Sequence, residues 1–256
     1  MSVGTPMIDL HCHVLPGIDD GPVTVDGSIA LARAAAAEGT RVLVATPHVN
    51  RRYNNRGEQI AELVAELGER FAAEGIFTPE GSSLEVRPGA EIALTRIAGL
   101  DQGELTRLRL GGGQWLLVEP PFTPVATGLD ALILDVLHKG HRVVLAHPER
   151  CPAFQRDPNM LHALVDAGVL LSVTAGALVG DFGGEPRKLA LRLAEEGLMH
   201  NVASDAHDHV DRPPHLARDI ERAGLAPLSG WLTEQVPAAI LDGREPPPRP
   251  DVTLAL

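Results

Sequence analysis

The sequence predicts an α/β protein, a (β/α) barrel with seven strands. Seven short apolar runs bounded by turn residues alternate along the chain with helical stretches, several of which end at a glycine. Strands that alternate with helices are joined by crossover connections, so they are expected to be parallel. Seven such units in 256 residues favour a barrel over an open sheet.

The elements follow one another in order. Strands are expected in "PMIDLH" (6–11), "RVLVATPH" (41–48), "LEVRPGAEI" (84–92), "WLLVEPP" (115–121), "RVVLAHP" (142–148), "VLLSVTAG" (169–176) and "NVASDAH" (201–207). Helices are expected over 26–39, 56–75, 128–140 and 189–197. No internal boundary interrupts this alternation, so residues 1–243 are predicted to be one domain. The prolines of "REPPPRPD" (244–251) predict that 244–256 is an extended C-terminal tail.

Charge and composition exclude several classes of protein. The formal net charge is −12 and no run of lysine and arginine forms a basic face, so nucleic acid is not an expected partner. No apolar segment is long enough to span a membrane and no basic region precedes one at the N-terminus, so neither membrane insertion nor a leader is expected. The two cysteines are too few for a disulfide framework. A cytoplasmic location is therefore expected.

Side chains that bind metals stand at the C-terminal end of nearly every predicted strand. They are His11, His13, His48, Glu91, Glu119, His147, Asp205 and His207. In barrel enzymes this face carries the chemistry. A convergent set of histidine, glutamate and aspartate is typical of a metal-dependent hydrolase. The other histidines are interpreted mostly as surface or helix-terminal residues: His138, His141, His162, His200, His209 and His215.

The spacing of the first pair has a geometric reason. Residues two apart on a strand point to the same face, so His11 and His13 are expected to reach one metal together, and the same is expected of Asp205 and His207. Cys12 should then point into the packing. Imidazole and carboxylate ligands without thiolates suit manganese, iron or zinc, and so many ligands predict two or three divalent ions.

The motifs "DLHCHVLPGIDDG", "ATPH", "GAEI", "LVEPP", "LAHPERC", "TAGALVGDFG" and "ASDAHD" resemble, in order and spacing, the polymerase-and-histidinol-phosphatase (PHP) superfamily. More narrowly the chain resembles the manganese-dependent bacterial protein-tyrosine phosphatases that accompany capsular and exopolysaccharide synthesis. The resemblance covers residues 7–216. It implies a distorted seven-stranded (β/α) barrel of the PHP type that holds a trinuclear metal centre, with manganese as the favoured ion.

Matched position by position, the resemblance implies the ligands of three metals. The first is held by His11, His13, Glu91 and Asp205, and Glu91 bridges to a second, completed by Glu119 and His147. The third is held by Asp20, His48 and His207, with Asp20 rather than Asp19 as the matching position. Arg150 and Arg212 stand where the family has phosphate-binding arginines. Arg51, Arg52 and Arg56, in a loop that varies among relatives, are candidates for substrate contact.

The expected activity is hydrolysis of phosphotyrosine on proteins by a metal-bridging hydroxide, with Arg150, Arg212 and His207 as catalytic groups. A bacterial tyrosine kinase of polysaccharide synthesis is a candidate partner, and the oligomeric state stays open. A cysteine nucleophile is not expected, because neither Cys12 nor Cys151 has an arginine at the required spacing. Three alternatives remain: another PHP phosphoesterase acting on histidinol phosphate or a nucleotide, an amidohydrolase-type metal hydrolase, and a metal-stabilised scaffold without catalysis.

Overall fold

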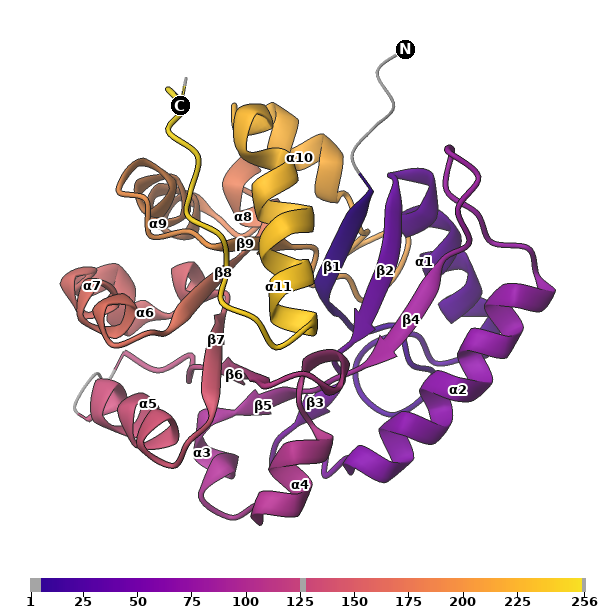
Figure 1. Ribbon diagram of the computed structural model, residues 1–256, viewed down its shortest axis with the longest axis horizontal. Helices are drawn as coiled ribbons and strands as arrows, with labels where there is room; N and C mark the ends of the chain where they lie inside the picture. The colour runs from indigo at the N-terminus through magenta and orange to yellow at the C-terminus, as the bar shows by residue number, and fades with distance from the viewer. Residues whose placement is uncertain (1–5, 125–127, 255–256) are drawn as a thin grey trace.

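The computed structural model describes residues 6–124 and 128–254, over which strands alternate with helices (Figure 1). The strands are β1 Met7–Cys12, β2 Thr40–Ala45, β3 His48–Val49, β4 Glu85–Pro88, β5 Glu91–Ala93, β6 Trp115–Glu119, β7 Arg142–Ala146, β8 Leu170–Thr174 and β9 Asn201–Ala203. The α-helices are α1 Val25–Ala37, α2 Gly57–Ala73, α3 Leu94–Ile97, α4 Gln102–Arg107, α5 Leu129–His138, α6 Pro152–Arg156, α7 Asn159–Asp166, α8 Ala175–Val179, α9 Gly184–Glu195, α10 Leu216–Arg222 and α11 Val236–Leu241. Every segment predicted to be a strand contains one.

The named strands pair in parallel and form two sheets. One sheet has three strands in the order β1-β2-β4, and the other has six in the order β3-β5-β6-β7-β8-β9. The prediction of an α/β protein with parallel strands is therefore confirmed. The described residues do not, however, form the single closed seven-stranded sheet that was expected.

The division into two sheets arises because two predicted strands are interrupted. Segment 41–48 gives β2 and then β3, with Pro47 between them, and segment 84–92 gives β4 and then β5. Proline has no N–H to donate to a ladder, so Pro47 ends the pairing of β2. At Gly89 a Cβ would lie 2.9 Å from Cγ1 of Val44, so these two segments approach each other closely only because glycine has no side chain.

The first and last strands lie side by side and join the two sheets at their ends. Cys12 and Ala206 form an isolated parallel bridge. The backbone N–H of His13 donates to the carbonyl of Ala206 at 2.9 Å, and that of Asp205 donates to the carbonyl of His11 at 2.9 Å. These bonds bring together the two chain segments richest in predicted metal ligands.

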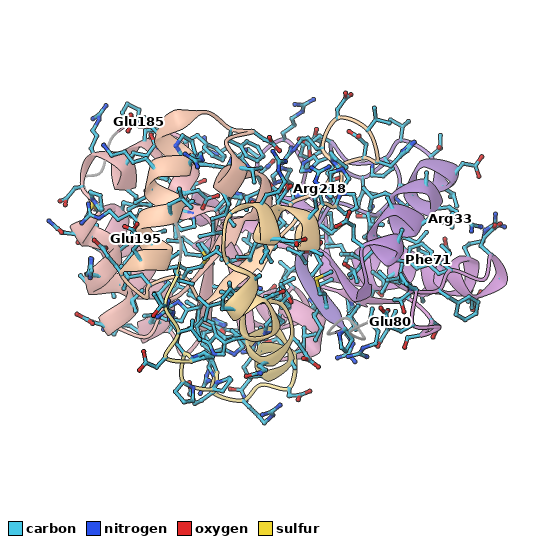
Figure 2. The ribbon with its side chains drawn as sticks, turned by 90° about the horizontal axis from the view of Figure 1, so that it is seen from above. Arg33, Phe71, Glu80, Glu185, Glu195 and Arg218 are labelled. Atoms are coloured by element: carbon cyan, nitrogen blue, oxygen red, sulfur yellow. The ribbon has the colours of Figure 1, made fainter. Side chains whose placement is uncertain are left out.

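Burial explains the two kinds of sequence pattern. Residues 116–118 of β6 are uninterrupted apolar residues and have no exposed surface, as expected for a parallel strand covered on both faces. In α2 the buried residues recur at helical spacing, and Phe71 is among them. Figure 2 shows Phe71 and Arg33, from α2 and α1, at one end of the molecule, with Glu185 and Glu195 of α9 toward the other.

The C-terminal part of the chain packs back onto the body. Helix α11 is drawn in front of the strands in Figure 1 and contacts β1. Residues 244–254 have no helix or strand, but the indole of Trp231 donates to the carbonyl of Pro247 at 3.0 Å. A boundary at residue 243 stays a prediction, and the outer ends of both predicted parts, 1–5 and 255–256, lie outside the described residues. Among the residues that the structure describes, no helix combines the length and apolar character needed to cross a membrane.

Candidate metal centre

The predicted metal-binding side chains gather where the strands end. Glu119 is the last residue of β6, His147 directly follows β7, and Asp205 lies just beyond β9. Four overlapping groups, each with one ligand atom per residue within 4.8 Å of the others, together contain all nine predicted ligands: His11, His13, Asp20, His48, Glu91, Glu119, His147, Asp205 and His207.

The H-x-H pair at the C-terminal end of β1 points to one place, with His13 directly after the strand. The Nε2 atoms of His11 and His13 lie 3.2 Å apart, and each lies 3.4 Å from Oδ1 of Asp205. Each also lies 3.4 Å from Oε2 of Glu91. All four side chains are almost fully buried. The two imidazoles therefore share a face, as the strand spacing predicts.

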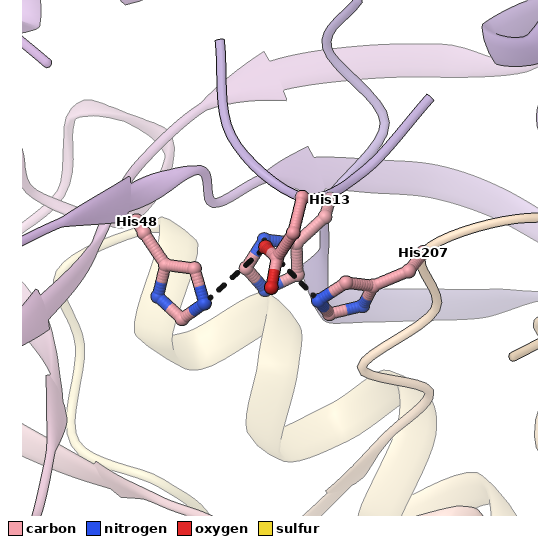
Figure 3. A group of neighbouring side chains, drawn as sticks. His13, His48 and His207 are labelled. Carbon is pink, nitrogen blue, oxygen red and sulfur yellow. Dashed lines mark ion pairs between the residues drawn. The ribbon is translucent and has the colours of Figure 1, made fainter. Parts of the chain in front are cut away.

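A second group surrounds Asp20, and Figure 3 shows its three imidazoles around one carboxylate. Oδ1 of Asp20 lies 3.5 Å from Nε2 of His48, 3.4 Å from Nε2 of His207 and 4.0 Å from Nδ1 of His13. His207 holds the pKa of the Asp20 carboxyl well below its usual range. Because Asp20 is about half exposed, this group opens toward solvent.

Glu91 links the groups through its two oxygens. Oε1 lies 2.6 Å from Nε2 of His147, and Oε2 lies 2.9 Å from Nδ1 of His48. Burial, and then the charge of Glu91, raise the pKa of the neighbouring Glu119 to about 8. Burial also opposes ionisation of Glu91, yet His11 and the other imidazoles keep its pKa well below the usual value. Two carboxylates this close need nearby positive charge to be ionised together.

Two ligand candidates adopt a strained backbone. His147 has φ 32° and Asp205 has φ 51°, and they are the non-glycine residues with positive φ in the described parts of the chain. The expectation that Asp205 and His207 share a strand face is wrong, because β9 ends at Ala203 and both residues lie on the following loop. They fall in different groups, Asp205 with the β1 histidines and His207 with Asp20.

Asp19 orients the centre, a role that the sequence reasoning missed. Its Oδ2 accepts from Nδ1 of His13 at 2.7 Å and from the backbone N–H of His48 at 3.1 Å, and its Oδ1 accepts from the N–H of Gly21 at 2.9 Å. Against the effect of burial, the hydrogen bond from His13 lowers the pKa of Asp19. A carboxylate on the far nitrogen of a metal-binding imidazole fixes the tautomer and the ring. The signal available in the sequence was the pair of adjacent aspartates.

Asp9 was also missed, and it ties the first strand to the last. Its Oδ2 accepts from the hydroxyl of Ser204 at 2.5 Å, and its Oδ1 accepts from the N–H groups of Ser204 and His11 at 3.0 and 3.2 Å. Burial raises the pKa of this carboxyl. Asp9 stands two residues before His11, on the same strand face, and that spacing was the clue.

The two predicted phosphate-binding arginines meet at the edge of the centre. Arg150 and Arg212 both donate to Oδ2 of Asp205, at 2.6 and 2.7 Å. The ring of Phe182 lies beneath both guanidinium groups, 4.4 Å from Cζ of Arg150 and 5.9 Å from Cζ of Arg212. Asp205 thus faces the histidines with one oxygen and the arginines with the other.

The loop after β3 carries the other predicted arginines outside the centre. Arg51, Arg52 and Arg56 are exposed. Buried Asn55 anchors the loop by donating to the carbonyl of His48 at 2.9 Å. The ring of Tyr53 stacks on the ring of His48 at 5.9 Å. The structure therefore places this loop beside the centre, with its arginines facing solvent.

Neither cysteine resembles a nucleophile. Cys12 is fully buried, as expected, and burial raises its pKa well above the usual value. Burial also raises the pKa of Cys151.

The surface interpretation is wrong for His141, which is 3% exposed, because it directly precedes β7, where the chain enters the core.

The donor set fits divalent cations. Glu91 Oε2, His48 Nδ1 and His207 Nε2 are buried and make no well-oriented hydrogen bond within the described residues. Buried polar atoms normally have hydrogen-bond partners. A bound cation would be the partner of these convergent imidazole and carboxylate lone pairs. Oxygen and nitrogen donors without thiolate suit manganese, iron and zinc.

Comparisons with known proteins agree on one family. A family model described as "Capsular polysaccharide synthesis, CpsB/CapC" matches residues 7–223. Tyrosine-protein phosphatase YwqE of Bacillus subtilis is 38% identical over 210 residues, covering 82% of this chain and 80% of that protein. The putative tyrosine-protein phosphatase CapC of Staphylococcus aureus is 32% identical, covering 81% and 79%.

Solved structures show the same relationship. A crystal structure from a study of YwqE from Bacillus subtilis and CpsB from Streptococcus pneumoniae, described as metal-dependent tyrosine phosphatases, matches with a TM-score of 0.80 and 33% identity, covering 98% of this chain and 100% of that one. A dihydropyrimidinase from Brevibacillus agri, with a TM-score of 0.58 and 13% identity over 93% of this chain and 71% of that one, shares the fold alone. The chain belongs to the CpsB/CapC family of capsular polysaccharide synthesis.

Proposed function

We propose that this chain is a metal-dependent phosphatase that removes phosphate from phosphotyrosine on proteins of capsular or exopolysaccharide synthesis. The observation that carries the proposal is the joint placement of nine metal-binding side chains beside two arginines that meet at Asp205. Membership of a family whose relatives are named tyrosine-protein phosphatases supports it.

The proposed centre holds three divalent ions, most simply manganese. His11, His13, Glu91 and Asp205 would hold the first ion, Glu119 and His147 would join Glu91 around the second, and Asp20, His48 and His207 would hold the third. Bound there, the ions would supply Lewis acidity toward a phosphoryl oxygen and lower the pKa of water. The four groups support this division except for Glu119, which falls in a group with His48 and Glu91 and not in the group that contains His147.

The proposed phosphate clamp is the pair Arg150 and Arg212. Both side chains are only partly exposed, and both are held by Oδ2 of Asp205, so their planar heads are fixed beside the metal ligands. A guanidinium donates two parallel hydrogen bonds to phosphate oxygens, which stabilises charge as it develops on the phosphoryl group. His207 is a candidate to assist the leaving oxygen, and the exposed Arg51 and Arg52 are candidates to contact the phosphoprotein on either side of the tyrosine.

The finer features of the setting belong to the same proposal. The two sheets are proposed to form the wall of one distorted seven-stranded barrel, supported by the bonds between the ends of β1 and β9. The protein is proposed to act in the cytoplasm, where a bacterial tyrosine kinase of polysaccharide synthesis would be its phosphorylated partner.

The deciding experiment is an assay of the manganese-loaded protein on a phosphotyrosine peptide, with and without a chelator, alongside histidinol phosphate and a short oligonucleotide. Activity on the peptide that chelator abolishes is expected, and elemental analysis should find three metals per chain. Glu91→Gln should abolish activity, whereas Glu85→Gln, at an exposed glutamate of β4, should not. Preference for histidinol phosphate or the oligonucleotide would contradict the substrate assignment, and one metal per chain would favour the amidohydrolase alternative.

A further inference from the structure

Aromatic side chains are scarce in this chain, and three of them contact residues of the proposed centre. The sequence has one tyrosine and five phenylalanines. The tyrosine, Tyr53, stacks on His48, and Phe122 stacks on His147. Phe182 lies under the two arginines. Each of the three rings touches a candidate metal ligand or a candidate phosphate-binding arginine, so each is placed to contact a bound substrate.

Phe122 is distinguished by its exposure. Its ring lies 5.5 Å from the ring of His147, at an interplanar angle of 21°, and 5.1 Å from Cζ of Arg150. Its side chain is nevertheless 46% exposed, directly after the prolines that follow Glu119. An apolar ring that touches a metal ligand candidate and a phosphate-binding candidate, yet remains half open to water, has a free surface at the edge of the centre.

We infer that Phe122 forms a subsite for the aromatic ring of the substrate, and this inference rests on the proposed function. In an aryl phosphate a single oxygen separates the ring from phosphorus, so a phosphate held by Arg150 brings the ring within reach of Phe122. Stacking of two aromatic rings contributes binding beyond the area that they bury. The short aliphatic group of phosphoserine gains no such contact, so Phe122 selects aryl over alkyl phosphates.

Tyr53 is less suited to this role. The guanidinium of Arg52 lies 4.9 Å from the centroid of its ring, and its other neighbour is the parallel ring of His48. The contacts of Phe182 are likewise with Arg150 and Arg212, and its side chain is less exposed than that of Phe122. Of these three rings, Phe122 is therefore the one that both contacts Arg150 and has a large exposed surface.

The test compares phenyl phosphate, methyl phosphate and inorganic phosphate as ligands of the metal-loaded protein, together with hydrolysis of a phosphotyrosine peptide. Phe122→Leu keeps an apolar side chain and removes the ring. It should weaken binding of phenyl phosphate, and lower kcat/KM for the peptide, by about three- to tenfold. Binding of methyl phosphate and inorganic phosphate should change by less than about twofold on the same reasoning.

The matched control is Phe77→Leu, at a phenylalanine that is 57% exposed and lies in the hairpin bridge to Ser83. This variant should bind all three ligands as tightly as the wild type does. Unchanged preference for phenyl over methyl phosphate in Phe122→Leu would overturn the inference, as would an equal loss for all three ligands, because Phe122 would then act only by positioning Arg150. The inference and the proposed function can fail separately. If the wild type binds phenyl phosphate preferentially through Phe122 but hydrolyses no phosphopeptide, the subsite is supported and the proposed function is refuted.

Discussion

Asp19 gives the sharpest test of how the centre is organised, because it touches the proposed metal ligands without belonging to them. Its carboxylate accepts three hydrogen bonds, from the ring of His13 and from the backbone N–H groups of Gly21 and His48. In Asp19→Asn one acceptor oxygen becomes an NH₂ group, which must face at least one of these donors. The ring of His13 then keeps at best a neutral amide oxygen in place of the carboxylate that fixes its tautomer.

The expected loss follows from the kind of bond that is removed. A hydrogen bond to a charged group contributes about 1.5–3 kcal/mol. Loss of a carboxylate behind a metal-binding imidazole typically lowers metal affinity or activity by about 10–100-fold. We therefore expect Asp19→Asn to weaken manganese binding by about that factor, and to recover part of its activity when manganese is raised.

The assay is competition for manganese between the protein and a chromophoric chelator, followed by kcat/KM on the phosphotyrosine peptide over a range of manganese concentrations. Thermal unfolding of the metal-free proteins shows whether the variant still folds. Asp166→Asn, at the exposed end of α7, is the matched control and should behave like the wild type. Manganese affinity and activity within about twofold of wild type in Asp19→Asn would refute the reasoning, because the bond to His13 would then have no effect on the centre.

Two further predictions concern Cys12 and His200, which are not among the proposed ligands. Cys12→Ser should retain most activity while His13→Ala abolishes it; loss of activity in Cys12→Ser with manganese still bound would restore a cysteine mechanism. Burial lowers the pKa of His200 to about 4, so the unfolded chain takes up a proton there as pH falls below about 6.5 and the folded chain does not. Between pH 7 and 5 this residue should remove about 2 kcal/mol of stability, a loss that is complete once pH passes below about 4. In His200→Gln, the free energy of unfolding measured by chemical denaturation should fall correspondingly less over this pH range. Equal pH dependence of that free energy in the variant and the wild type would contradict the assignment.

The convergence of the ligand candidates could be predicted from the sequence, because their spacing carries geometric information. His11 and His13 alternate with Cys12 on a strand, and the strand directs the two imidazoles together whatever the rest of the fold does. Predicted strand segments were likewise found, since uninterrupted apolar runs between turn residues leave few other structures. The position of Asp20 came from family resemblance, because adjacent aspartates in a loop have no periodicity to separate them.

Features that depend on contacts distant in sequence could not be predicted in this way. Asp9 and Ser204 are separated by 195 positions and meet only because β1 and β9 lie side by side. Asp205, whose φ is 51°, lies at the same junction, where its N–H donates to the carbonyl of His11. The break between β2 and β3 could have been anticipated at Pro47, but the consequence, a second sheet, depends on the partner strands.

Asp205 is the residue through which metal binding and phosphate binding are coupled in the proposed centre. Oδ1 lies 3.4 Å from the β1 imidazoles, and Oδ2 holds Arg150 and Arg212 at 2.6 and 2.7 Å. A shorter or longer side chain would separate the two functions, and a relaxed backbone would turn the carboxylate away. In the proposed centre, this one carboxylate at a strained φ would hold both arginines beside the metal ligands, where an arriving phosphate would meet both.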